Sequence, residues 1–161
     1  MRDHIRPREH GGTLIEVLVA VALFLLGVVG VVSAMGVVVS NQADVQIRSE
    51  AAMRAESMLN TMWLNVDRTT PAATALSLQN FAHLTGTEQA CNFAGAASSN
   101  NLVTAWVSDV TSGAGKLPGS TPAMQQILVD TTANNQVTIT LCWQSSGDAA
   151  PRQYVLRSYV N

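Results

Sequence analysis

A single carboxylate stands where a long apolar stretch begins. Glu16 is followed by Val17–Val39, which contains no charged side chain. An ionised carboxylate next to hydrocarbon is costly, and such residues are usually paired with another charge. No lysine or arginine lies within helical reach of Glu16. We therefore expect the partner of this carboxylate to come from another molecule.

A local role for Glu16 is the alternative. Thr13 and Glu16 have the spacing of a capping box, in which the threonine hydroxyl accepts from a backbone amide and the carboxylate reaches back to the cap. A carboxylate near a helix N-terminus is also favourable by about 0.3–1 kcal/mol. The apolar residues that follow favour the intermolecular role over the local one.

The chain has two cysteines, Cys91 and Cys142, and both follow the apolar stretch. If that part of the chain lies outside the cytoplasm, a disulfide between them is expected. It would close a loop of about 50 residues and stabilise the fold by ~4 kcal/mol if loop entropy dominates. Two separate buried thiols are the alternative.

Residues for catalysis or metal binding are scarce. His83 is the only histidine after residue 10, and we interpret it as a surface or loop residue because no ligand cluster surrounds it. The sequence has no nucleophile motif, paired acids or phosphate loop, so we expect no enzyme, no cofactor and no metal. A net charge of −2 and few aromatic residues argue against nucleic-acid binding. We expect all three tryptophans in the core: Trp63, Trp106 and Trp143.

The apolar stretch is long enough to cross a membrane. Val17–Val39 as a helix spans roughly 34 Å, against ~30 Å for the hydrocarbon core of a bilayer. Residues 1–11 carry one more basic than acidic residue, so the positive-inside tendency places them in the cytoplasm and the rest outside. We expect three segments: a cytoplasmic leader (1–11), a transmembrane helix (12–40) and a periplasmic head (41–161).

The helix is predicted to continue beyond the membrane. No proline or glycine occurs between Val37 and Thr70, and the pattern changes from apolar on all sides to amphipathic. Glu50 precedes Arg54 by four residues, a spacing that supports a helix. We predict one helix from about Thr13 to about Asn65. Its apolar series is Val45, Ala52, Ala55, Leu59, Met62 and Val66, with Ala51, Met58 and Trp63 beside it.

The remainder predicts a small antiparallel sheet. Three strand candidates follow one another, with Asn134-Asn135 supplying the first turn, and the amphipathic half of the long helix is expected to cover one face. The fold class is therefore α+β. Before the sheet we expect a short helix with Leu76, Phe81 and Leu84 inward, then a loop, then a helix or a strand. These elements are 74–84, 85–100, 101–111, 126–132, 136–144 and 153–160.

The residues around the carboxylate resemble a known signal. Gly11 followed by Gly12-Thr13-Leu14-Ile15-Glu16 and an apolar run resembles the class III signal of type IV pilins and pseudopilins. The resemblance implies cleavage between Gly11 and Gly12 by a prepilin peptidase, which also methylates the new N-terminus. It further implies that Glu16 pairs with the terminal amine of a neighbouring subunit. The first mature residue in this family is usually phenylalanine or methionine, whereas here it is Gly12.

The later part of the chain resembles the PilV group of minor type IV pilins. The resemblance rests on Trp106, Leu117-Pro118-Gly119, Cys142-Trp143 and a last strand containing Tyr154. It implies an inner-membrane protein that helps to assemble or initiate a pilus with the major pilin and other minor pilins, at the base or tip of the fibre.

Two alternatives remain open. One is a minor pseudopilin of a type II secretion system, which has the same parts. The other is a soluble periplasmic protein with an ordinary signal peptide, cut after Val32-Ser33-Ala34 so that the mature chain starts at Met35.

Overall fold

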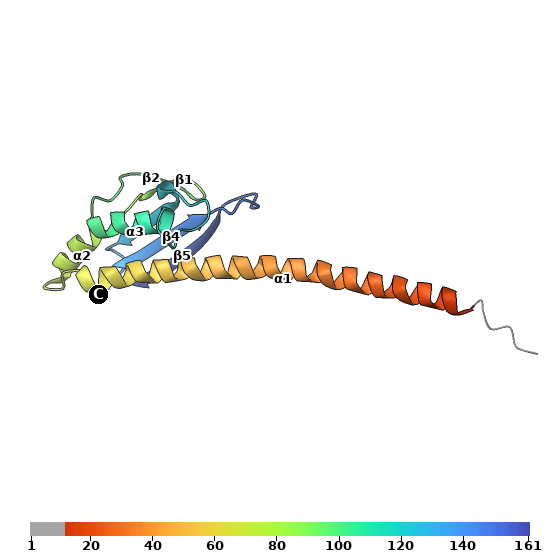
Figure 1. The fold of residues 1–161 in the computed structure, drawn as a ribbon. Coiled ribbons are helices and arrows are strands. Elements are labelled where there is room, and N and C mark those ends of the chain that lie inside the picture. Colours follow the sequence, from red (N-terminus) through yellow and green to blue (C-terminus); the bar gives the residue numbers. More distant parts are fainter. Residues whose placement is uncertain (1–11) are drawn as a thin grey trace, which may run out of the picture. The chain divides into compact units, whose positions relative to one another are not determined.

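The computed structural model describes the backbone of residues 12–161, and the side chains of these residues except 12, 13, 34 and 36–41. The chain divides into two compact units, the first ending at Asp44 and the second comprising Val45–Asn161. One helix, α1 (Gly12–Asn65), contributes residues to both units (Figure 1). The single helix predicted from Thr13 to Asn65 is confirmed.

In the first unit, residues 17–33 of α1 carry no charged side chain. The segment Leu14–Ser33 has a mean hydropathy of 2.8, and none of it is buried within the protein. Among the described residues this is the one helix whose length and composition would let it cross a membrane, a property that signal sequences share. The hydroxyl of Ser33 donates to the Val29 carbonyl at 3.0 Å, so this polar group is satisfied within the helix.

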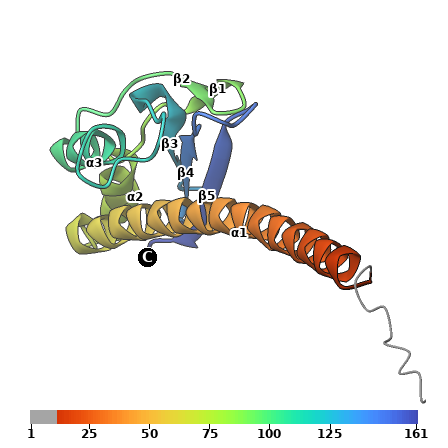
Figure 2. The ribbon, with the colours of Figure 1, turned by 45° about the vertical axis from the view of Figure 1, so that its right-hand side comes forward.

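The second unit is built on a three-stranded antiparallel sheet. Its strands are β3 (Gln125–Asp130), β4 (Gln136–Trp143) and β5 (Arg152–Tyr159), in the order β3-β4-β5 (Figure 2). The predicted meander is confirmed. Asn134 and Asn135 both have φ of 53°, in the left-handed region that asparagine tolerates better than most residues, and they form the predicted turn.

Residues 45–65 of α1 cover one face of this sheet, as predicted (Figure 2). Ala51, Ala55, Met58 and Met62 are fully buried at three- and four-residue spacing, so they form one stripe of the helix. Helices α2 (Pro71–Gln79) and α3 (Asn101–Thr111) add buried side chains to the same core. On the sheet side this core contains Ile127, Val137, Ile139, Leu141 and Trp143.

Two residues of the predicted apolar series of α1 are exposed, and Ala52 and Leu59 are half-buried. Val45 is 69% exposed and Trp63 is 39% exposed. Trp63 directly follows Met62, so it lies about 100° around the helix from the buried stripe. The guanidinium of Arg68 lies over the Trp63 ring, 5.1 Å from its centroid, in a cation–π contact. The expectation that Trp63 belongs to the core was wrong, whereas Trp106 and Trp143 are buried as predicted.

Helix α2 begins earlier than predicted because of its cap. The Thr70 hydroxyl accepts from the Ala73 backbone N–H at 3.1 Å, and Pro71 occupies the first helical position, where its missing N–H costs nothing. The helix then buries Thr74 and Leu78. Leu76 lies between these two on the opposite side and is 66% exposed, so its predicted inward position was wrong.

A cap also decides the nature of residues 101–111. The Asn100 side-chain oxygen accepts from the Leu102 backbone N–H at 2.9 Å. This bond satisfies one of the free amides at a helix start, and the segment forms α3, with Val103, Trp106, Val107 and Val110 buried.

The predicted loop at 85–100 contains a small hairpin instead. Strands β1 (Gly86–Gln89) and β2 (Asn92–Ala94) pair antiparallel. Cys91 lies in the turn between them with φ of 63° and forms a disulfide with Cys142 on β4. The predicted disulfide is confirmed, and the prediction of loop alone was wrong. Because Cys142 alternates with Leu141 and Trp143, the hairpin covers the sheet face opposite the main core. A second small cluster there contains Cys91, Phe93 and Cys142, with Leu84 and Met124 against it.

Candidate processing and assembly site

Of the two residues of the predicted processing site, the structure describes Gly12. Gly12 is the first residue of this helix. Gly11 and the leader lie outside the described residues, as does the Thr13 side chain. The capping box therefore stays a prediction, as does cleavage between Gly11 and Gly12.

Glu16 projects from a helix surface that is otherwise apolar. Its side chain is exposed, and among the described residues it makes no hydrogen bond and no ion pair. Helical geometry places Ala20, Leu23 and Gly27 on the same face, at four, seven and eleven residues further on. A neighbouring helix that contacts Glu16 can therefore continue along a face that includes small residues.

The glycines of this part of α1 are not required by packing within the chain. A Cβ added at Gly27 or Gly30 would meet nothing within 4 Å. Glycine in a helix interior costs roughly 0.5–1 kcal/mol relative to alanine. Close approach of another helix is one use that such glycines have in membranes.

Two contacts fix α1 to the rest of the second unit, and both involve Arg54. The Trp106 indole N–H donates to the Arg54 backbone carbonyl at 2.9 Å, which ties α3 to α1. The predicted pair of Arg54 and Glu50 is present at 2.9 Å. A Cβ at Gly115 would collide with the Arg54 guanidinium, so the turn after α3 also packs directly on this pair. The start of the head is thus tied to its interior by polar contacts as well as by the core.

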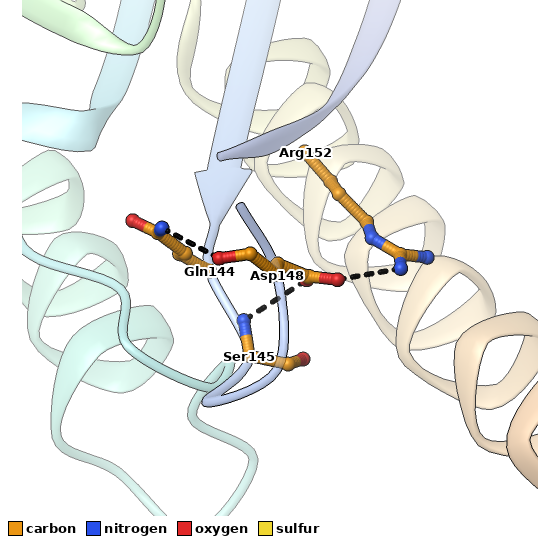
Figure 3. Close-up of polar contacts among 4 residues, drawn as sticks. All are labelled: Gln144, Ser145, Asp148 and Arg152. Atoms are coloured by element: carbon orange, nitrogen blue, oxygen red, sulfur yellow. Dashed lines mark hydrogen bonds and ion pairs between the residues drawn. The ribbon is translucent and has the colours of Figure 1, made fainter. Parts of the chain in front are cut away.

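Figure 3 shows a second polar cluster, in the loop between β4 and β5. Asp148 accepts from the Arg152 guanidinium at 2.6 Å and from the Ser145 backbone N–H at 3.2 Å. Its own carbonyl accepts from the Gln144 side-chain amide at 3.0 Å. The Arg152 hydrogen bond, more than the Ser145 amide, holds the pKa of Asp148 below its ordinary value of 3.8. These contacts close the loop between β4 and β5.

Binding of a metal or cofactor finds no support in the described residues. They include no group of three histidine, cysteine, aspartate or glutamate side chains that could hold a metal ion. The largest of the described surface cavities, of about 550 Å³, lies between the end of α2 and the loop before α3. Its lining is small and neutral: Gln79, Asn80, Ala82, Thr85, Ala96, Ala97, Ser98, Ser99 and Asn100.

His83 lies in the loop between α2 and β1, which agrees with the prediction of a surface or loop histidine. It is only 4% exposed, however, so it is a buried loop residue and does not lie at the surface. Its backbone forms an isolated bridge to Ile127 of β3. Burial lowers the pKa of the His83 imidazole, against a smaller opposing influence of the Pro122 backbone. No sequence pattern indicates this, because the contact joins residues 44 positions apart.

The comparisons with known proteins concern the start of the chain. No curated protein and no solved structure matches the sequence. Residues 6–32 match the family model of the prokaryotic N-terminal methylation motif. This range includes Gly11, Gly12 and Glu16, and the motif favours a structural protein over an enzyme. It is the class III signal of type IV pilin-like proteins, and it indicates a pilin or a pseudopilin.

Proposed function

We propose that this protein is a minor pilin of the PilV group, a structural subunit that takes part in the assembly or initiation of a type IV pilus. The observation that carries the proposal is Glu16, which lies within the methylation motif on an apolar helix. It has no partner among the described residues. An unpaired carboxylate in such surroundings calls for a cation from outside the chain.

In this mechanism the processing step creates the missing cation. Cleavage between Gly11 and Gly12 by the prepilin peptidase leaves an amine at the new terminus. That amine on one subunit then pairs with Glu16 of its neighbour. The attraction is strong because the pair forms where water is scarce. A wrongly registered subunit leaves the carboxylate unpaired, so the pair selects the register of the fibre.

The proposed topology follows from the same motif. Residues 1–11 stay in the cytoplasm, 12–40 cross the inner membrane, and 41–161 form a periplasmic head. The Cys91–Cys142 disulfide supports the last assignment, because disulfides persist outside the cytoplasm. The head then contacts the major pilin and other minor pilins. We propose that the protein later resides at the base or tip of the fibre.

Two alternatives differ from this proposal, one in the assembly system that the protein serves and the other in the site of cleavage. A minor pseudopilin of a type II secretion system would carry the same motif and the same Glu16. The neighbouring genes distinguish it from a pilin. A soluble periplasmic protein cut after Ala34 is less well supported, because α1 continues from Gly12 to Asn65 without interruption. That cut would divide a helix whose later residues build the core.

The first test is the mature N-terminus. The protein is isolated from membranes with and without the prepilin peptidase, and its intact mass and N-terminal sequence are measured. We expect a start at Gly12 that disappears without the peptidase. A start at Met35 would contradict the proposal and favour a secreted soluble protein. An uncut chain would leave Glu16 without a partner amine at Gly12.

The second test is the carboxylate itself. Glu16→Gln removes the charge at nearly constant size, and we expect the variant to be processed but not incorporated into fibres. Glu56→Gln is the matched control, since Glu56 is an exposed glutamate of the same helix within the head. It should assemble as the unmodified protein does. Normal incorporation of Glu16→Gln would overturn the role of the carboxylate.

A further inference from the structure

His83 joins a surface segment to the edge of the sheet. Its backbone N–H donates to the Ile127 carbonyl and its carbonyl accepts from the Ile127 N–H, both at 3.0 Å. Its ring nitrogen Nδ1 accepts from the Ser98 backbone N–H, also at 3.0 Å. Because β3 is an edge strand, one residue thus connects this edge to the loop that precedes α3.

The Ser98 contact fixes the state of the ring. A nitrogen that accepts a hydrogen bond carries no proton, so the neutral ring holds its hydrogen on Nε2. Nε2 is buried, and no hydrogen bond of this atom is found among the described residues. The Pro122 backbone favours the protonated ring, but less than burial disfavours it. A second proton would have to go on Nδ1, where the new N–H would point at the Ser98 N–H. Two donors then face each other, and the bond to the loop is lost.

The surroundings offer no charge that would stabilise a protonated ring. Helix α2, the short 3-10 helix η1 (Pro122–Met124) and residues 95–100 contain no ionisable side chain. Strand β4 contains none besides the disulfide-bonded Cys142. Asp130 of β3 lies three residues beyond Ile127 and is exposed. Glu88 of β1 is exposed and accepts from the Asn92 side chain. A protonated His83 is therefore a buried cation without a counter-charge, which is costly.

We propose that His83 is an acid-sensitive latch that holds residues 84–100 against the sheet and releases them when its ring takes up a proton. The disulfide keeps the hairpin tethered through Cys91 while the rest of the segment loosens. Two other side-chain contacts hold this segment. The Gln126 amide donates to the carbonyls of Leu84 and Gly86 at 2.7 and 3.2 Å, and the Ser98 hydroxyl donates to the Asn80 carbonyl at 3.2 Å. Neither Gln126 nor Ser98 titrates, so we assign the pH dependence to His83.

The direction of the effect follows from linkage. In the open state the His83 ring has its ordinary pKa, near 6.5, and in the closed state burial lowers the pKa. Above pH 6.5 the ring is neutral in both states, and the latch is fully closed. Below pH 6.5 the His83 ring binds a proton in the open state, whereas the buried ring of the closed state stays neutral. The opening equilibrium constant then rises by up to about tenfold per pH unit, until the pH reaches the pKa of the closed state.

Hydrogen exchange of the full-length protein in detergent micelles tests the latch. Amide protection is measured between pH 7.5 and 5.0, under conditions where the opening equilibrium limits exchange, and is corrected for the intrinsic pH dependence. We expect the protection of Leu84 and Ser98 to fall by up to about tenfold per pH unit below 6.5. Strand β4 serves as the internal control and should show no such slope. Protection of residues 84–100 that is independent of pH would overturn the proposal.

A variant isolates the ring. His83→Asn keeps an acceptor at the δ position but does not titrate, so we expect the pH slope at residues 84–100 to vanish. A slope that persists in this variant would assign the effect to another group and overturn the proposal.

A second measurement needs no variant. Nuclear magnetic resonance of the protein labelled at histidine reports three rings, His4, His10 and His83. We expect the His83 ring to show the hydrogen on Nε2 and to titrate below 6.5. A hydrogen on Nδ1, or titration at or above 6.5, would overturn the latch even if His83→Asn failed to fold.

Discussion

The two parts of α1 differ in whether their apolar side chains find partners within the chain. Residues 14–33 of α1 are exposed on every side and apolar apart from Glu16 and Ser33, whereas residues 45–65 bury one stripe and expose most of the rest. The second part finds its apolar partners within the chain. The first part finds none there, although it is rich in valine and glycine, which are poor helix formers in water. Its helix requires surroundings in which unpaired peptide groups are costly, such as lipid or the apolar interior of a fibre.

Removal of the disulfide is expected to have the largest effect on the head. Replacing Cys91 and Cys142 together by serine should lower its free energy of unfolding by about 4 kcal/mol, because the unfolded chain regains the freedom of a long loop. Denaturant unfolding followed by tryptophan fluorescence measures this, since all three tryptophans lie in the second unit. The helicity of residues 14–33 should be unchanged. Equal stability of the two forms would mean that the core alone holds the hairpin.

Replacing one large apolar side chain by alanine in each part of α1 should change the stability of the head in only one of the two cases. Met62→Ala empties a fully buried site and should lower the free energy of unfolding of the head by about 3 kcal/mol. Leu25→Ala removes an exposed side chain of the first part and should leave this quantity unchanged. Both are measured by the same denaturant titration. A large effect of Leu25→Ala on the head would show that the two parts are not independent.

An introduced carboxylate should have the opposite pattern of effects, because its cost is larger in the apolar part of α1 than in the head. Val28→Asp places a carboxylate within the apolar segment and should cost roughly 3 kcal/mol of membrane insertion. Met53→Asp places the same group on the exposed side of the head part, where water solvates it. We expect an insertion assay to show loss only for Val28→Asp. Equal insertion of the two variants would contradict a membrane-spanning role for residues 14–33.

The hydrogen bond between α3 and α1 should contribute less to the stability of the head than the disulfide or the buried Met62 side chain. Trp106→Phe removes the indole N–H that donates to the Arg54 carbonyl and should destabilise the head by about 1 kcal/mol. Because the ring position stays filled, the core should remain packed. Thermal unfolding checks the loss, and Trp143→Phe is the control, since no hydrogen bond of its indole appears among those described. A smaller loss for Trp106→Phe than for the control would argue against this anchor.

The smallest expected effect depends on pH. Asp148 has a lowered pKa, so its charged form stabilises the loop between β4 and β5 above the ordinary value of 3.8. This contribution is lost as the pH falls through the lower pKa of the folded state. Asp148→Asn should therefore be slightly less stable than the unmodified protein at pH 7. The difference should shrink as the pH falls below 3.8 and disappear below the pKa of the folded state, in thermal unfolding curves recorded over this range. A difference that persists in acid would point to hydrogen-bond geometry in place of charge.

Elements with a regular local pattern could be predicted from the sequence. The long helix, the strand alternation of β4, the Asn134-Asn135 turn and the sheet order all follow from periodicity and turn chemistry within a few residues. The signal around Glu16 is equally local, and the family match covers it. The disulfide was predictable because the chain has two cysteines and both lie beyond the apolar stretch.

The tertiary structure decided what depends on distant residues. The position of His83 involves contacts with Ile127 and Ser98, and the hairpin at 86–94 is joined to β4 by the disulfide. Whether Trp63 and Leu76 are exposed depends on which side of each helix packs against the core. Neighbouring residues differ by about 100° around the helix axis, and composition does not specify which side is buried. The sequence by itself thus determined the helix, the strands and the signal, because these rest on local periodicity and motif. Packing determined which side chains are buried, because burial requires partners from elsewhere in the chain.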